Sequence, residues 1–209
     1  MNGKGMVSSL DSILQWVTRI VMLNLLWFLF SLLGLFLLGI FPATVAALGI
    51  SKRWINGEQD ISLYKTFKKN YKEEFKIANI IGWIFISIGV ILFINYRVIV
   101  GTETEFWIGT IFGFYFIVFL YSITVVWSFP LLIHYKNNWF QYLKIGLIIG
   151  LVKLHYTVGI YSAIIAIVYL SLRYPGVIPF FSMAIIAVIW YWLCSRVFKQ
   201  IDKKLIIDT

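Results

Sequence analysis

Long apolar runs, separated by short polar and basic segments, make up most of the 209-residue chain. About 18 consecutive apolar residues mark a helix that spans a membrane. Several runs exceed this length, and five spans are predicted, at residues 20–41, 77–95, 106–133, 154–172 and 177–193. Backbone groups in lipid must be hydrogen-bonded within their own segment, so each run is expected to be an α-helix. The pattern predicts an all-α, polytopic transmembrane helical bundle in which residues 1–209 form a single membrane domain.

The stretch GIFPATVAALGISKRW, which begins at Gly39, interrupts this pattern with a proline, small residues and two adjacent cations. Gly39 and Pro42 are expected to break the first helix, because proline lacks an N–H and clashes with the preceding turn. Proline is well tolerated in the first turn of a new helix. The stretch therefore predicts a short sixth membrane segment at residues 42–57. Five segments, with the N-terminus outside the cell, are the alternative.

Two segments are amphipathic at helical spacing. Residues 8–19 carry apolar side chains on one face, which predicts an interfacial helix leading into the first span. Residues 61–78 carry aromatic side chains on one face and lysines on most of the other, which predicts a cytoplasmic helix that docks on lipid or on a partner. The candidate docking face consists of Tyr64, Phe67, Tyr71, Phe75, Lys68 and Lys72.

The net charge of +9 could indicate nucleic acid as a partner, but the positions of the cations argue against it. Lysine and arginine cluster between the first and second spans, between the third and fourth, and after the last. The other two loops hold only Arg97 and Arg173. The positive-inside rule places the three basic regions in the cytoplasm. We expect a multi-pass protein of the bacterial plasma membrane, in contact with lipid, with both termini cytoplasmic if there are six segments.

The residues that carry enzyme or ion-coupling chemistry are scarce. All nine carboxylates lie outside the predicted spans, whereas ion-coupled transporters usually keep an ionisable group inside the bundle. His134 and His155 are too far apart for a metal pair on one helix turn. A single cysteine, Cys194, gives no disulfide framework. We therefore expect no enzymatic activity, no metal site and no cofactor.

Small and mildly polar residues within the predicted segments are candidates for contacts between helices or with a partner. The amides of Asn24 and Asn79 are the costliest of these groups to leave unpaired in lipid. Two glycines with three residues between them let helix backbones approach closely. The candidate set is Asn24, Trp27, Gly34, Pro42, Thr44, Asn79, Gly109, Gly113, Gly146 and Gly150.

Two stretches, WVTRIVMLNLLWFLFSLLGLFLLGIFPATVAALGISKRWINGEQDI and YKTFKKNYKEEFKIANIIGWI, are similar to the YesL family of small bacterial membrane proteins. The resemblance rests on elements such as Asn24, Gly39, the Phe41-Pro42-Ala43-Thr44 sequence and Asn79. It covers the first hundred residues well and the second half more loosely. The family supplies no catalytic residues. What the resemblance implies is a context in Gram-positive bacteria, beside oligosaccharide-degrading enzymes and binding-protein-dependent sugar importers.

Architecture and resemblance together predict an accessory integral-membrane subunit of a carbohydrate (oligosaccharide) ABC importer, packed on the permease subunits. One alternative is an independent small transporter or channel, since Phe-Pro pairs at 41–42 and 129–130 suggest duplicated halves. The other alternative is a regulatory or lipid-interacting membrane protein that uses the basic amphipathic helix.

Overall fold

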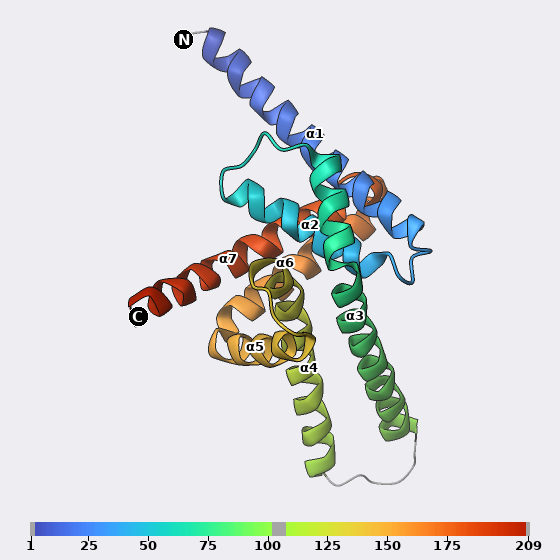
Figure 1. Ribbon diagram of the computed structural model, residues 1–209. Helices are drawn as coiled ribbons and strands as arrows, with labels where there is room; N and C mark the ends of the chain where they lie inside the picture. The colour runs from blue at the N-terminus through green and yellow to red at the C-terminus, as the bar shows by residue number, and fades with distance from the viewer. Residues whose placement is uncertain (1–2, 102–107, 208–209) are drawn as a thin grey trace.

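The computed structural model describes residues 3–101 and 108–207, and every regular element in these two ranges is a helix. The elements are α1 (Gly3–Leu33), α2 (Ile40–Ile55), α3 (Leu63–Gly101), α4 (Ile108–His134), α5 (Trp139–Val152), α6 (Leu154–Arg173), the 3₁₀ turn η1 (Pro175–Val177), the π-helical turn η2 (Ile178–Ser182) and α7 (Met183–Ile207). This confirms the predicted all-α class (Figure 1).

Five helical segments are long and apolar enough to cross a membrane, as predicted for a polytopic protein. They are Leu10–Leu33, Leu63–Gly101, Ile108–His134, Leu154–Arg173 and Pro175–Lys203. The predicted start of the third run, at residues 106 and 107, lies outside the described residues. The chain is thus a multi-pass membrane protein.

The first break in the chain is earlier than the sequence suggested. One helix, α1, covers both the expected interfacial helix at 8–19 and most of the expected span at 20–41, and it ends at Leu33. A Cβ on Gly34 would collide with the backbone of Gly39, so the turn needs this close approach of two glycines. Leu35 and Phe36 adopt positive φ within it. Apolar side chains continue through this turn, which is why composition did not reveal it.

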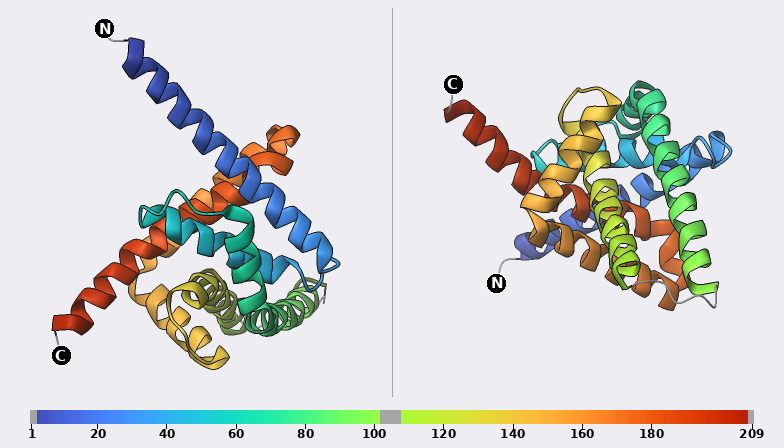
Figure 2. Two further views of the ribbon diagram at one scale, coloured as in Figure 1. Left: turned by 45° about the horizontal axis from the view of Figure 1, so that its top comes forward. Right: turned by 90° about the horizontal axis from the view of Figure 1, so that it is seen from below.

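Helix α2 then begins at Ile40, and Pro42 lies in its first turn, where a missing N–H costs no intrahelical bond. Ten of its 16 residues are buried. It contacts α1, α3, α4 and α7, and Figures 1 and 2 show it crossing the middle of the bundle. The small side chains of Ala43, Ala46 and Ala47, each at most 1% exposed, allow this close packing.

The amphipathic segment predicted at 61–78 and the span predicted at 77–95 form one continuous helix, α3, of 39 residues. The sequence changes there from charged to apolar, but no proline or turn signal ends the helix. Helix α5 was not predicted, because its 14 residues are too few for a span and merge with the next apolar run. The last predicted span, 177–193, begins at the end of the 3₁₀ turn η1, passes through the π-helical turn η2 and continues as α7 to Ile207.

The outer halves of α3 and α4 form a two-helix arm, defined here as residues 86–101 and 108–122. The arm extends away from the other helices in Figure 1. None of its residues is buried. At its base the hydroxyl of Tyr121 donates a hydrogen bond to the carbonyl of Phe85 at 2.9 Å. The arm is therefore anchored at one end and its apolar surface is open.

Candidate functional site

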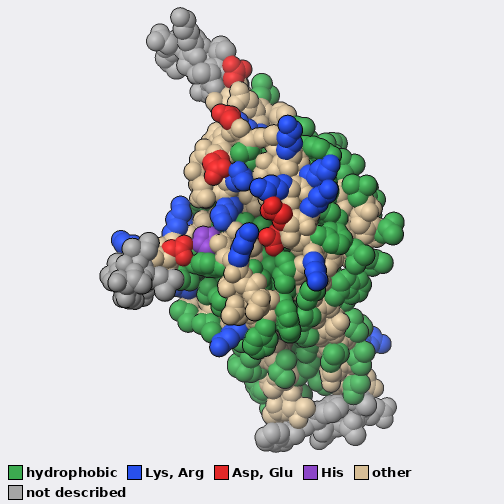
Figure 3. Space-filling view, viewed as in Figure 1, with side chains coloured by type: hydrophobic (Ala, Val, Ile, Leu, Met, Phe, Trp, Pro, Cys, Tyr) green, Lys and Arg blue, Asp and Glu red, His purple; other side chains and the backbone are tan. Residues whose placement is uncertain are grey.

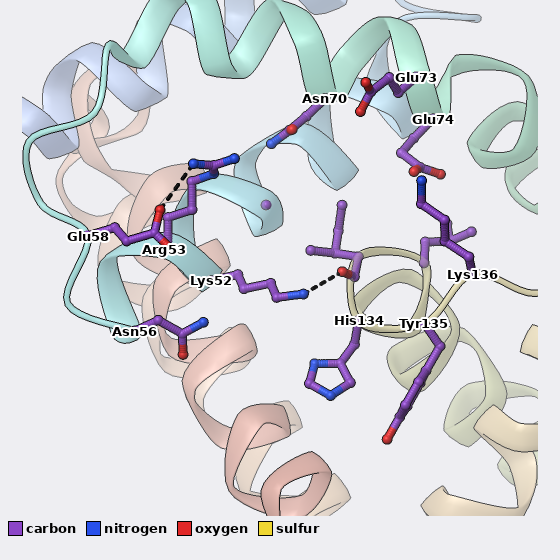
Figure 4. Close-up of a pocket in the computed structure, with 13 residues that line it drawn as sticks. Lys52, Arg53, Asn56, Glu58, Asn70, Glu73, Glu74, His134, Tyr135 and Lys136 are labelled. Atoms are coloured by element: carbon purple, nitrogen blue, oxygen red, sulfur yellow. Dashed lines mark hydrogen bonds and ion pairs between the residues drawn. The ribbon is translucent and has the colours of Figure 1, made fainter. Parts of the chain in front are cut away.

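A polar pocket of about 380 Å³ lies beside the C-terminal end of α2. Its walls come from α2, from the first third of α3, and from the end of α4 with the residues that follow it (Figure 4). In the space-filling view most visible lysines and arginines lie over this half of the molecule, whereas the α3–α4 arm is mainly hydrophobic (Figure 3). The pocket thus lies at the basic end of the bundle.

Helix α2 contributes two cations to the pocket. The ammonium of Lys52 donates a hydrogen bond to the carbonyl of Ile133 at 2.9 Å. That carbonyl belongs to the last turn of α4, where unpaired carbonyls and the helix dipole favour a positive charge. Arg53 pairs with Glu58 at 3.1 Å, across a turn in which Gly57 has a φ of +92°. A left-handed glycine therefore ends the helix and turns Glu58 back onto it.

Helix α3 contributes the opposite wall with Asn70, Glu73 and Glu74. Asn70 reaches the pocket because residue 49 is glycine: a Cβ there would collide with the Asn70 amide. Figure 4 shows Lys136 and Glu74 pointing toward each other from opposite walls. In the part of the chain that the structure describes, the side chains of Asn70 and Lys136 have no hydrogen-bond partner. These polar groups are open to a bound molecule.

A hydrogen-bond network fixes the neighbouring wall between α4 and α7. His134 contacts the Asp202 carboxylate through Nε2 at 3.0 Å and the Tyr191 hydroxyl through Nδ1 at 3.1 Å. The Tyr135 hydroxyl donates to the other oxygen of Asp202 at 2.6 Å. Burial, followed by this hydrogen bond, raises the pKa of Tyr135 well above its usual range. The His134 ring also stacks on Phe198, with ring centroids 4.5 Å apart.

The same two side chains, His134 and Tyr135, turn away from the cavity in Figure 4. They hold the end of α4 in place and leave the ligand-facing positions to charged groups. The carboxylates of α3 stand on one side of the pocket and the cations of α2 and Lys136 on the others, where Glu58 is already paired with Arg53. This separation suits a ligand that carries both signs of charge.

Asn24, the first predicted packing residue, is completely buried and makes four hydrogen bonds. Its amide nitrogen donates to the carbonyls of Ile178 at 3.2 Å and Pro179 at 2.6 Å. Its amide oxygen accepts from the N–H groups of Met183 at 2.9 Å and Ala184 at 3.1 Å. The side chain therefore ties α1 to the point at which the π-helical turn becomes α7.

The other predicted polar positions also make contacts between helices. The Trp27 indole donates to the Thr44 hydroxyl at 3.1 Å, which joins α1 to α2. The Asn79 amide donates at 3.0 Å to the carbonyl of Leu38, in the turn between these two helices. These residues and the buried Pro42 lie on α2 or beside it, and none of them lines the polar pocket.

The predicted glycine pairs differ from each other. Gly146 lies against Ser128, and a Cβ on Gly150 would collide with the Ile123 side chain, so both bring α5 close to α4. By contrast, a Cβ on Gly113 would meet nothing within 4 Å. Gly109 is half-buried on the same arm. Gly113 therefore lies on an open surface, whereas Gly146 and Gly150 pack two helices of this chain together.

Three aromatic residues of the candidate docking face pack against other parts of the same chain. Phe67 and Tyr71 are buried, and both rings pack on Phe30 of α1 with centroids 5.1 and 5.0 Å apart. The Tyr71 hydroxyl donates to the Phe30 carbonyl at 3.2 Å. Phe75 is half-buried against Tyr71. Tyr64, at 54% exposed, remains on the surface together with Lys68 and Lys72.

Comparison with known proteins gives the family. Residues 20–96 match the family described as "Protein of unknown function, DUF624". The uncharacterized protein YteU of Bacillus subtilis (strain 168) is 35% identical over 177 residues, which cover 83% of this chain and 78% of YteU. The chain belongs to the DUF624 family. This confirms the resemblance to YesL-type proteins noted in the sequence.

Two further relatives from the same organism cover nearly the whole length of this DUF624 protein. The uncharacterized protein YesL is 25% identical over 197 residues, or 94% of this chain and 93% of YesL. The uncharacterized protein YesV is 28% identical over 186 residues, or 89% of each chain. No solved structure matches the chain.

Proposed function

We propose that the protein is an accessory integral-membrane subunit of a carbohydrate (oligosaccharide) ABC importer in the bacterial plasma membrane, and that it has no catalytic activity of its own. In this proposal it packs laterally on the permease subunits. The carbohydrate context comes from the family resemblance. The structural observation that supports a partner within the membrane is the open groove of the α3–α4 arm.

The groove runs between the two helices of the arm and has a volume of about 650 Å³. Its lining is almost entirely apolar and includes Ile91, Leu92, Phe114 and Ile117, with Gly113 on its α4 side. Asn95, one of its few polar residues, satisfies its amide on the Ile91 carbonyl of its own helix at 2.8 Å. The groove therefore offers shape and apolar contact rather than polar chemistry.

Lipid tails are as apolar as leucine side chains, so transmembrane helices associate mainly through close van der Waals packing. Two helices joined as a hairpin would gain such packing along their whole length. Here they separate beyond Tyr121 and leave Gly113 exposed. A transmembrane helix of a permease, seated between α3 and α4, would supply the missing contacts, and the glycine would allow its backbone to come close.

The test is co-purification of the tagged chain with importer permeases, in mild detergent, from cells that express the whole operon. Gly113→Phe should fill the groove and lower permease recovery about tenfold, the effect of losing about 1.4 kcal/mol of binding free energy. Gly159→Phe, on α6, is the matched control, because a Cβ at that glycine also meets open space. We expect the control to recover permease as the unmodified chain does.

Two results would contradict the proposal. The unmodified chain could purify alone from cells in which the permeases are present. Alternatively, Gly113→Phe could recover as much permease as Gly159→Phe, which would remove the groove from any interface.

A further inference from the structure

We propose that the polar pocket binds a phosphoethanolamine group, the headgroup of the zwitterionic phospholipid phosphatidylethanolamine. The proposal does not depend on the importer assignment, since it concerns the basic end of the bundle and not the arm. It rests on the charges, the unoccupied hydrogen-bonding groups and the shape of the pocket.

The pocket is lined by three cations, Lys52, Arg53 and Lys136, and by three carboxylates, Glu58, Glu73 and Glu74. Glu73 and Glu74 lie together on α3, and Lys52 and Arg53 lie together on α2, with Lys136 on the third wall (Figure 4). A phosphate accepts charge-assisted hydrogen bonds from lysine and arginine. A primary ammonium donates to carboxylates. A ligand with a phosphate at one end and an ammonium at the other therefore matches both walls.

The pocket also keeps hydrogen-bonding capacity that the protein does not use. Lys52 uses one N–H on the Ile133 carbonyl, and an ammonium has three. Arg53 gives one nitrogen to Glu58 and has five N–H donors in all. Lys136 makes no hydrogen bond to any described residue. These three side chains can donate to a phosphate without breaking the contacts that hold the pocket.

The surroundings of the pocket leave room for the rest of a lipid molecule. A second hollow of about 690 Å³ lies next to it, shares Glu73, Glu74 and Lys136 as lining residues, and is also lined by Ile77 and Tyr142. On α3 no charged residue follows Lys76 until Arg97, and the first exposed side chains after Lys76 are apolar, with Ile80 36% and Trp83 38% exposed. A headgroup in the pocket can thus leave its acyl chains along the apolar surface of α3.

The same geometry disfavours other common headgroups. Phosphatidylglycerol carries no positive charge and would leave Glu73 and Glu74 facing an anion. Phosphatidylcholine has a quaternary ammonium, which cannot donate hydrogen bonds to carboxylates and is recognised instead by aromatic rings. The aromatic residue that lines the pocket, Tyr135, turns its ring away from it. We therefore expect selectivity for the ethanolamine headgroup over both others.

The experiment uses the full-length chain, purified in detergent and delipidated. Native mass spectrometry measures binding of phosphatidylethanolamine, phosphatidylglycerol and phosphatidylcholine with identical acyl chains, and free O-phosphoethanolamine is added as a competitor. Glu74→Gln and Lys136→Gln should each weaken phosphatidylethanolamine binding about tenfold, which corresponds to one charge-assisted hydrogen bond. Lys65→Gln is the matched control, because Lys65 is exposed on α3 and does not line the pocket.

Selective binding of phosphatidylethanolamine that the Gln variants weaken supports the lipid as the source of the headgroup. Binding of free O-phosphoethanolamine without binding of the lipid supports the same chemistry with a soluble ligand. Equal binding of the three lipids would overturn the proposal, and so would pocket variants that bind like Lys65→Gln. Because Lys136 is exposed, its substitution should leave the fold intact, and thermal unfolding of each variant checks this.

Discussion

Replacing Asn24 with alanine should destabilise the bundle more than any comparable change of a polar residue on its surface. The amide is completely buried and bridges two carbonyls and two N–H groups where the π-helical turn meets α7. An alanine side chain makes none of these four contacts. A side chain that inserts into the backbone hydrogen bonds of a helix can hold a distortion there. The Asn24 amide does this at the junction of η2 and α7, so we expect that junction to lose its support in the alanine variant.

The magnitude follows from the number of bonds. Hydrogen bonds between transmembrane helices average about 0.6 kcal/mol in mutational cycles and reach about 1–2 kcal/mol in model peptides. Four bonds at about 0.6–1 kcal/mol each give a loss of about 2–4 kcal/mol in the free energy of unfolding. This is a large fraction of the stability of a typical protein, about 5–15 kcal/mol.

Reversible unfolding with sodium dodecyl sulfate in mixed micelles, followed by tryptophan fluorescence, measures this free energy, and the chain has nine tryptophans to report on it. Asn95→Ala is the control, because Asn95 is exposed and makes one hydrogen bond within its own helix. We expect the control to change stability by less than about 0.5 kcal/mol. If Asn24→Ala and Asn95→Ala lowered stability equally, the amide would not be holding α1 to α7.

Two further predictions concern the contact between α4 and α5 and the pH dependence of stability. Gly150→Ala should lower the free energy of unfolding by about 1–3 kcal/mol, because the new methyl group collides with Ile123, whereas Gly159→Ala should be neutral or slightly stabilising in the same assay. The pKa of Tyr135 is higher in the folded chain than its usual value of 10.0, so its contribution to stability is present below that pH and is lost as pH rises through and above it. Tyr135→Phe should therefore make the decline in stability between about pH 9 and 11 shallower, and an unchanged slope would show that the phenol ionises equally well in the folded chain.

The sequence predicted the parts of the fold that depend on composition. The apolar runs identified the spanning helices, and Gly39 and Pro42 indicated a break followed by a short helix. The turn itself, however, depends on contact between the backbones of Gly34 and Gly39, which hydropathy does not record. Helix α5 was not predicted as a separate helix, because only Lys153 separates its apolar residues from those of α6.

The polar pocket was not predicted, because its charged groups come from three separated parts of the chain. Lys52, Glu74 and Lys136 each have an ordinary explanation in the sequence as charges at the ends of apolar runs. Only the fold brings them around one cavity. Conversely, the aromatic face at 61–78 has the spacing of a docking helix, and the pattern could not show that its partner is Phe30 of the same chain. The predicted association with an importer remains a prediction.

The continuity of α3 has a mechanical consequence. At about 1.5 Å per residue, its 39 residues form a rod about 58 Å long, nearly twice the roughly 30 Å thickness of a bilayer's hydrocarbon core. Glu73 and Glu74 in the pocket and Ile91 in the groove are carried by this one rod. A tilt of about 5° around one end would move the other by roughly 5 Å, given that length. If both proposed molecules bind, this one helix would connect them mechanically, and a movement imposed in the groove would be transmitted to the pocket.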